Sequence, residues 1–213
     1  HYKLQLTFNP ATQIVSGTVT ISGTSLVPGL SYIDLDFYNN MAISSVTTGL
    51  TSLTFSQANN VLTINLDHLY AVSEPWSVAI TYSGHPTNVD SSFAFTSISG
   101  SILMASLSEP VGARTWWPCK DRPDDKATAE MIFTVPQDYI ATSNGVLTGT
   151  TTDTGAGTKT YTWVENHPIT TYLISIAAYP YSSFSHTYTP IGGGSMPVVY
   201  YVYPAHLANA QIS

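Results

Sequence analysis

The chain has 213 residues and a net charge of −7; only 9% of its residues are charged, whereas 43% are hydrophobic and 12% aromatic. This composition excludes an intrinsically disordered chain, because disorder requires few aromatic residues and a high net charge. It also disfavours a nucleic-acid partner, since six Lys and Arg residues are too few to neutralise a phosphate backbone.

Apolar and polar residues alternate along the first half of the chain with a period of two, which is typical of strands that bury one face. The alternation predicts strands at 2–8, 15–21, 33–37, 62–66 and 76–82. A further apolar run at 53–57 is separated from the strand that follows it by Asn59-Asn60. Because Asn tolerates the left-handed backbone of tight turns, this pair predicts a hairpin.

The second half of the chain continues in the same way, with strands separated by glycine-containing turns. Turn signals lie at Asn144-Gly145, at 155–157 and at 192–194. No segment repeats apolar residues at helical spacing behind a capping residue, so no long helix is expected. The predicted strands of this half are 127–135, 139–142, 146–150, 160–164, 172–177, 184–189 and 198–203.

These patterns predict an all-β fold: a large antiparallel β-sandwich, or a curved, saddle-like domain of several sheets. Residues 1–213 are expected to form one domain, since all-β domains of this length are common. No run approaches the roughly 18 apolar residues of a membrane span. Cys119 is the single cysteine, and no His is followed by Glu or lies four residues from another His. We therefore expect no metal site and no cofactor in this chain.

Charge is concentrated between residues 109 and 130, where four of the six basic residues lie. A solvated turn with weak surface ion pairs would explain this segment. However, Trp116 and Trp117 follow Arg114 closely, which suggests a partly buried guanidinium. A buried Arg requires a carboxylate partner. The candidates are Glu109, Asp121 and Asp125.

Residues 108–123 read Ser-Glu-Pro-Val-Gly-Ala-Arg-Thr-Trp-Trp-Pro-Cys-Lys-Asp-Arg-Pro, and Asp-Lys-Ala-Thr at 125–128, Thr-Val-Pro at 134–136 and Ser-Asn-Gly at 143–145 follow. This order of motifs resembles the amino-terminal domain of the aminopeptidase N family, the zinc metallopeptidases that include aminopeptidase N and the leukotriene hydrolase. Segments 2–4, 16–19 and 172–174 are also similar to that domain, so the resemblance covers nearly the whole chain.

The resemblance implies an all-β domain that packs against a thermolysin-like catalytic domain. That second domain carries His-Glu-x-x-His and a downstream Glu as zinc ligands, together with a Gly-x-Met-Glu-Asn strand, and none of these motifs occurs in this chain. The expected partners are therefore the protein's own catalytic domain and a peptide substrate. Zinc would be bound outside this chain, and the chain alone would be inactive.

The resemblance also assigns roles to residues of the charged segment. In the family, polar acceptors for the α-amine of the substrate lie seven and five residues before the Arg. Those positions are Leu107 and Glu109 here. Glu109 is the expected amine anchor, whereas Leu107 stands at an expected Gln position and cannot accept a hydrogen bond. Arg114, Asp121 and Lys126 are interpreted as the scaffold that fixes the loop.

Two other functions fit the composition. The 14 tyrosines and the abundant Ser and Thr are also typical of carbohydrate-binding or adhesion β-sandwiches, and a relative that has lost catalysis would share the same architecture. The start at His1, without Met or a signal sequence, indicates a trimmed or mature fragment. Few lysines and many Ser and Thr favour a secreted or periplasmic protein. Finally, the low charge predicts an apolar surface patch that other domains cover.

Overall fold

The computed structural model describes residues 1–86 and 92–212, and its regular secondary structure consists almost entirely of strands. One short α-helix, α1 (Leu207–Ala210), lies near the end of the described chain. The strands are β1 (Tyr2–Asn9), β2 (Ile14–Thr24), β3 (Leu30–Asp36), β4 (Met41–Thr48), β5 (Thr51–Ser52), β6 (Phe55–Ala58), β7 (Val61–Tyr70), β8 (Pro75–Gly84), β9 (Phe93–Ile98), β10 (Ser101–Ser106), β11 (Ala127–Pro136), β12 (Ile140–Thr142), β13 (Val146–Asp153), β14 (Thr158–Ile169), β15 (Ala177–Tyr179), β16 (Ser182–Tyr188) and β17 (Met196–Val202).

An eight-stranded sheet in the order β13-β14-β11-β1-β2-β8-β4-β5 forms the main layer. Its strands pair antiparallel except at the centre, where β1 runs parallel to β11 and places Leu4 opposite Met131. The other edge of β1 pairs antiparallel with β2. The first strand of the chain is therefore an internal strand of this sheet.

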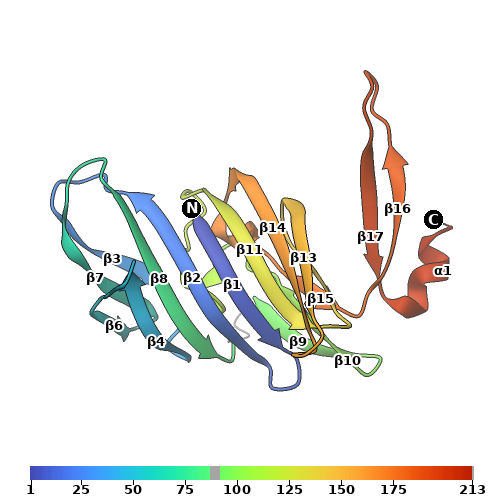
Figure 1. Cartoon of the computed structure of the whole chain (residues 1–213), viewed down its shortest axis with the longest axis horizontal. Coiled ribbons are helices and arrows are strands. Elements are labelled where there is room, and N and C mark those ends of the chain that lie inside the picture. The colour runs from blue at the N-terminus through green and yellow to red at the C-terminus, as the bar shows by residue number, and fades with distance from the viewer. Residues whose placement is uncertain (87–91, 213) are drawn as a thin grey trace.

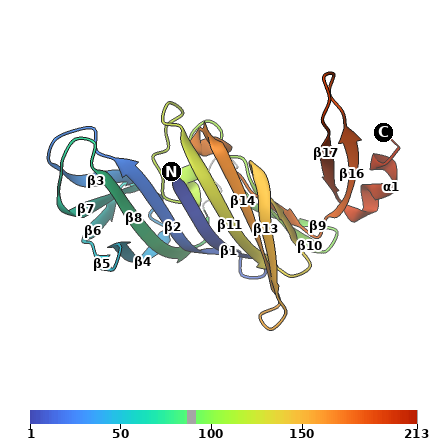
Figure 2. The same cartoon turned by 45° about the horizontal axis from the view of Figure 1, so that its top comes forward.

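Two smaller sheets lie behind the large one in Figures 1 and 2. One has the strand order β3-β7-β6 and the other β12-β15-β10-β9. The alternation in β1 explains the packing, because Tyr2, Leu4, Leu6 and Phe8 are all buried while the residues between them are not. One continuous apolar core contains residues of the large sheet and of both smaller sheets. The predicted all-β, multi-sheet fold without a long helix is confirmed.

Aromatic side chains form the centre of the core. Trp116 and Trp117 are fully buried, as expected of core residues. The Trp117 ring packs edge-on against Tyr2 at 5.0 Å between ring centroids. Phe8 lies 5.2 Å from Phe133 in a similar edge-on arrangement. The segment that carries the charged motif is thus fastened to the core by its own tryptophans.

The hairpin predicted at Asn59-Asn60 is present, and it joins β6 to β7. Both asparagines have positive φ angles of 53° and 61°, the conformation that such a turn requires. Four strands were missed by the sequence analysis: β4, β5, β9 and β10.

The predicted strand at 172–177 is wrong. A 3-10 turn, η3 (Thr171–Leu173), occupies its start, and β15 begins only at Ala177. Side-chain hydrogen bonds divert the backbone here: Asn144 Oδ1 accepts from both the backbone N and the hydroxyl of Ser175, at 2.9 and 3.0 Å. Ile174 and Ile176 are buried, so the apolar spacing reports burial rather than strand pairing.

Within residues 1–86 and 92–212, we find no helix with the length and hydropathy needed to cross a membrane.

Candidate functional site

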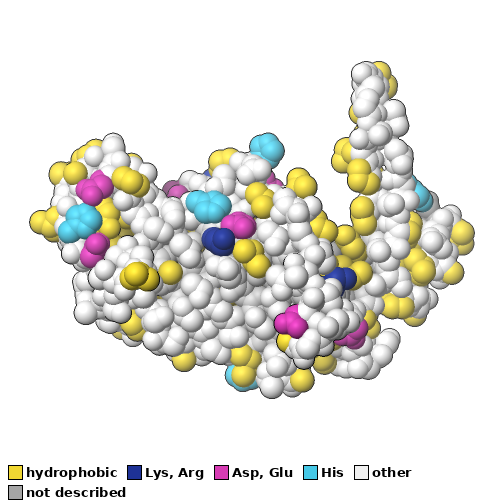
Figure 3. Space-filling view, in the orientation of Figure 1, with side chains coloured by type: hydrophobic (Ala, Val, Ile, Leu, Met, Phe, Trp, Pro, Cys, Tyr) yellow, Lys and Arg dark blue, Asp and Glu magenta, His cyan; other side chains and the backbone are white. Residues whose placement is uncertain are grey.

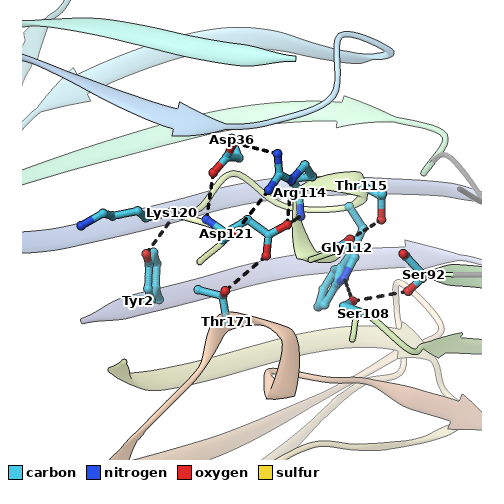
Figure 4. Close-up of polar contacts among 11 residues, drawn as sticks. Tyr2, Asp36, Ser92, Ser108, Gly112, Arg114, Thr115, Lys120, Asp121 and Thr171 are labelled. Atoms are coloured by element: carbon cyan, nitrogen blue, oxygen red, sulfur yellow. Dashed lines mark hydrogen bonds and ion pairs between the residues drawn. The ribbon is translucent and has the colours of Figure 1, made fainter. Parts of the chain in front are cut away.

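Arg114 is the centre of a polar network in the charged segment (Figure 4). It lies in a 3-10 turn, η2 (Ala113–Thr115). Its Nε donates to Asp121 Oδ2 at 2.8 Å, and its Nη1 donates to Asp36 Oδ1 at 2.9 Å. The backbone N of Asp121 donates to the other oxygen of Asp36 at 3.0 Å. The network therefore ties the segment to the end of β3.

Burial makes this network structurally important. The side chain of Asp121 is fully buried, whereas that of Arg114 is 27% exposed. Thr171, at the start of η3, donates its hydroxyl to Asp121 Oδ1 at 3.3 Å. Burial alone would lower the pKa of the Arg114 guanidinium, but the hydrogen bond to Asp121 and the charge of Asp36 raise it overall. Arg114 therefore stays charged and paired.

The structure brings two of the three predicted scaffold residues together. Arg114 and Asp121 are in direct contact. Lys126 has an exposed side chain and makes no ion pair or hydrogen bond within the described residues. Asp125, another candidate partner of the Arg, pairs instead with Lys120. Asp36 was missed, because it lies 78 residues before Arg114 and resembles the outward-facing residues of any strand.

Glu109 lies in the turn between β10 and η2. Its side chain is exposed, and among the described residues it makes no hydrogen bond or ion pair. Asp121 and Asp36 already neutralise Arg114, so Glu109 is not needed as a structural partner of that guanidinium. Its carboxylate is available to a ligand.

The backbone around Glu109 is held by buried neighbours. The indole Nε1 of Trp116 donates to the hydroxyl of Ser108 at 3.2 Å, and the backbone N of Leu107 donates to Ser92 O at 2.9 Å. A Cβ added to Gly112 would lie 2.1 Å from the Ser92 hydroxyl oxygen. A larger residue at position 112 would collide with Ser92, so this close approach on the turn that presents Glu109 depends on glycine.

Leu107 is 68% exposed, on the same turn as Glu109. Its side chain offers no acceptor at the position where the sequence analysis expected a Gln. A ligand amine near this turn would find the carboxylate of Glu109 but no amide from position 107.

Cys119 lies beside the Arg114 network and is fully buried. Its backbone forms an isolated bridge with Asp36. Burial raises the pKa of its thiol well above the usual range, and the carboxylates of Asp121 and Asp36 raise it further. Because the thiolate is the reactive form, this cysteine is protected by the fold.

We therefore expect Cys119 to be inert to dithiodipyridine at neutral pH until the protein unfolds. The absorbance of the released thiopyridone would follow the reaction at increasing urea concentrations. Rapid reaction in the absence of urea would show that the segment opens without global unfolding.

A pocket of about 430 Å³ lies elsewhere, next to the start of β1 and the β2–β3 connection. Its walls include Ile21, Leu30 and Trp76, and Lys120 and Asp125 also line it. No residue of the Glu109 turn contributes to this pocket. In residues 1–86 and 92–212, no three His, Cys, Asp or Glu side chains are grouped so that they could hold a metal ion.

Comparison with known proteins identifies the family of this chain. Residues 1–173 match the model of the peptidase M1 N-terminal domain. Glutamyl aminopeptidase of Homo sapiens is 30% identical over 109 residues, which are 51% of this chain and 11% of that protein. The chain thus covers only a small part of this relative.

Solved structures give the same result over a longer span. An M1 zinc metallopeptidase from Deinococcus radiodurans superposes with a TM-score of 0.81 and 27% identity, covering 94% of this chain and 46% of that one. Leukotriene A4 hydrolase from Saccharomyces cerevisiae shares the fold, with a TM-score of 0.76 and 20% identity over 100% of this chain and 32% of that one. The chain therefore belongs to the family of peptidase M1 N-terminal domains.

Proposed function

We propose that this chain is the non-catalytic amino-terminal domain of a zinc-dependent aminopeptidase, in which it walls the active-site cleft and anchors the substrate α-amine through Glu109. The observation that carries the proposal is the difference in burial and pairing between two acidic side chains. Asp121 is buried and paired with Arg114, whereas Glu109 is exposed on the β10–η2 turn without a partner among the described residues. The first serves the fold, and the second is free for a ligand.

The chemistry of an aminopeptidase requires such a group. An enzyme that acts only at chain ends must recognise a free ammonium, which carries three donors and no acceptor. A carboxylate is the strongest partner for it, because hydrogen bonds between charged groups are about twice as strong as neutral ones. With Leu107 beside it, Glu109 is the one anionic acceptor that this turn supplies.

The zinc ion of such an enzyme does not fit this chain, since the described residues contain no group that could hold it. Its ligands would come from the catalytic domain. The role of the residues described here is to bind and orient the end of the peptide. Hydrolysis of the first peptide bond would depend on groups outside residues 1–213.

A carbohydrate-binding module is the second candidate, and an aligned row of exposed aromatic faces would favour it. The hairpin of β16 and β17 does carry aromatic residues, but Phe184 and Tyr200 stack on each other with their ring centroids 4.7 Å apart and an angle of 7° between the planes. The inner faces of this pair are closed to a sugar, and only the outer face of each ring stays open, so the pair does not provide a row of open ring faces. The arrangement supports the peptidase role more than the sugar-binding one.

An activity assay on a longer form of the protein that includes the catalytic domain tests the proposal. We expect hydrolysis of an aminoacyl arylamide, strong loss of that hydrolysis when the amine is acetylated, and no hydrolysis by residues 1–213 alone. Hydrolysis by the 213-residue chain, or equal rates on the free and acetylated substrates, would contradict the proposal. An inactive longer protein would instead favour a relative that has lost catalysis.

A further inference from the structure

β3 is an edge strand of its three-stranded sheet. On one side it pairs with β7, in a regular register from Tyr32 to Asp36. On the other side, its only backbone partner within residues 1–86 and 92–212 is Cys119, which forms an isolated bridge with Asp36. The backbone N of Asp36 donates to Cys119 O at 2.7 Å, and the backbone N of Cys119 donates to Asp36 O at 3.2 Å. Pairing along this outer edge is therefore limited to one pair of residues.

The side chain of Asp36 ends this pairing. In an antiparallel ladder that continued from the bridge, Asp121 would lie opposite Asp34. The backbone N of Asp121 instead donates to Asp36 Oδ2 at 3.0 Å (Figure 4), and the backbone N of Lys120 donates to the hydroxyl of Tyr2 at 3.2 Å. After the bridge, the charged segment therefore does not continue along β3.

The backbone groups that remain free belong to Tyr32 and Asp34. Successive residues of a paired strand direct their backbone hydrogen bonds to opposite edges. The backbone N of Phe37 donates to Asn60 O at 2.9 Å, on the β7 side. Tyr32, Asp34 and Asp36 therefore face the outer edge, where the described residues provide no hydrogen-bond partner for the backbone of the first two. Such unpaired groups are a template for another strand.

The pocket of about 430 Å³ lies along this free edge. Its lining includes residues 32–35 in succession. A strand lines a pocket with consecutive residues only through its edge, because each of its faces presents every second residue. The volume is within the range of roughly 300–1,000 Å³ that is usual for ligand pockets. The free edge and the pocket thus form one site.

The other walls of the pocket come from the large sheet and from the β2–β3 connection. Ile21 and Trp76 supply apolar surface. The Trp76 ring lies over Gly23 on the neighbouring strand, since a Cβ added to Gly23 would be 2.6 Å from Trp76 Cζ2. In the β2–β3 connection, the backbone N of Ser25 donates to Glu74 O at 2.9 Å. These contacts shape an apolar pocket beside the edge of β3.

Exposed apolar side chains adjoin the pocket. Leu26 and Val27 of the β2–β3 connection line it, and they are 88% and 51% exposed. Hydrophobic side chains gather at the end of the molecule that carries β3 and β7, at the left of Figure 3. Exposed apolar groups that lie together are typical of interaction sites. The pocket therefore suits a ligand with apolar side chains.

The charged groups of the pocket leave it with a negative charge. Asp34 is exposed and accepts a hydrogen bond from the hydroxyl of Thr63, but no Lys, Arg or His of the described residues pairs with it. Asp125 is neutralised by Lys120. The α-amine of His1 is the remaining charged group of the lining, and burial lowers its pKa, so it balances Asp34 only in part. The free edge therefore favours a basic partner.

We propose that the free edge of β3 and the adjoining pocket bind an extended peptide in which apolar and basic residues alternate. The backbone of the peptide pairs with Tyr32 and Asp34 and adds a strand to the three-stranded sheet. Side chains of the added strand alternate between the two faces of the sheet. Its apolar side chains lie on the face of Ile33 and Leu35 and enter the pocket, whereas its Lys or Arg side chains lie on the face of Asp34. Glu109 takes no part, so this site is independent of the proposed function.

Titration calorimetry of the 213-residue chain with acetyl-Lys-Phe-Lys-Val-Lys-amide tests the proposal. Both ends of this peptide are blocked, so it offers no α-amine to Glu109. We expect saturable binding, and binding of acetyl-Glu-Phe-Glu-Val-Glu-amide that is weaker by about fivefold or more, because like charges on neighbouring strands repel. The absence of binding by the Lys peptide would overturn the proposal. Equal binding of the two peptides would also overturn it, since Asp34 would then select nothing.

A substitution at the free edge tests the backbone pairing. Tyr32→Pro removes an N–H that has no partner in the sheet, a change that edge strands tolerate. It should weaken binding of the Lys peptide by about fivefold or more, because a backbone hydrogen bond to the peptide is lost. Tyr32→Val is the matched control, which keeps the N–H and should bind as the wild type does. Equal binding by these two variants would show that the peptide does not pair with β3.

Amide hydrogen exchange of the wild type gives a second readout that does not depend on the folding of a variant. The amides of Tyr32 and Asp34 should exchange rapidly in the free chain. Saturating Lys peptide should slow that of at least one of them by about 10-fold or more, because an N–H bonded to the added strand is protected. Exchange at both positions that does not change with bound peptide would place the peptide elsewhere and overturn the proposal.

A second copy of this chain is the rival occupant of the edge. Sedimentation equilibrium without peptide distinguishes the two: a monomer supports the proposal, whereas a dimer in which the amides of Tyr32 and Asp34 are already protected overturns it.

Discussion

Replacing Glu109 with Ala in the longer enzyme should lower kcat/KM for an aminoacyl arylamide by about 10-fold to 150-fold. This range corresponds to the 1.5 to 3 kcal/mol expected of a hydrogen bond to a charged group. The physical reason is that the ammonium of the substrate would lose its anionic acceptor on the β10–η2 turn, where Leu107 offers none. Steady-state kinetics with the purified variant would measure the loss.

Controls separate this role from a structural one. Because Glu109 is exposed and makes no polar contact with the described residues, Glu109→Ala should leave the Tm unchanged. Glu109→Gln, which keeps an acceptor without its charge, should fall between the wild type and the Ala variant. Asp138→Ala removes another exposed carboxylate and should have no effect on kinetics. A loss below threefold for Glu109→Ala would rule out the amine-anchor assignment.

Replacing Asp121 with Ala should lower the free energy of unfolding of the 213-residue chain by about 3 kcal/mol, near the lower end of what breaking a buried ion pair costs. The change would remove the acceptor of Arg114 Nε and that of the Thr171 hydroxyl. Because the Arg114 side chain is partly exposed, water can solvate the unpaired guanidinium, and the loss of unfolding free energy is not larger. Urea unfolding followed by tryptophan fluorescence would measure it, since Trp116 and Trp117 lie in the adjacent core.

The matched control is Asp124→Ala. Asp124 pairs with Arg122 at 2.9 Å, but both side chains are mostly exposed, so its removal should change stability little. Thr171→Val gives a milder variant if Asp121→Ala fails to fold; it should cost about 1 kcal/mol through the lost hydrogen bond. Equal stability of the Asp121 and Asp124 variants would mean that the buried network does not stabilise the fold.

Local patterns were sufficient to predict most of the strands. In β1, every second residue is buried, so the period of two follows directly from the layered packing. β9 and β10 were missed although Ser99-Gly100 joins them, with φ angles of 48° and 86°. Two successive positive φ angles are typical of a tight hairpin turn, and Ser-Gly is a weaker signal for it than Asn-Gly. The strand predicted at 172–177 is wrong because a side chain distant in sequence, that of Asn144, holds the backbone of this segment by a hydrogen bond.

The candidate site was only partly predictable, for a similar reason. Arg114 and Asp121 lie seven residues apart. The neighbouring tryptophans indicated that the Arg needs a carboxylate partner, but they left Glu109, Asp121 and Asp125 as equal candidates. Asp36 comes from β3, and its contact with Arg114 depends on how the end of β3 packs against the segment that carries η2. No local sequence pattern indicates a contact between residues that lie 78 positions apart. The position of Glu109 was inferred from the family resemblance, and its role as an amine anchor remains a prediction.

The central place of β1 has a consequence for how the protein folds during synthesis. Of the strands described here, β1 leaves the ribosome before all the others, yet its parallel neighbour β11 ends only at Pro136. The antiparallel pairs of β1 with β2 and of β2 with β8 can form early, but β1 cannot pair with β11 until Pro136 has emerged. Pairing across so long a separation slows folding. Until then, one edge of β1 lacks its partner strand, and an unpaired strand edge is able to join incorrect partners.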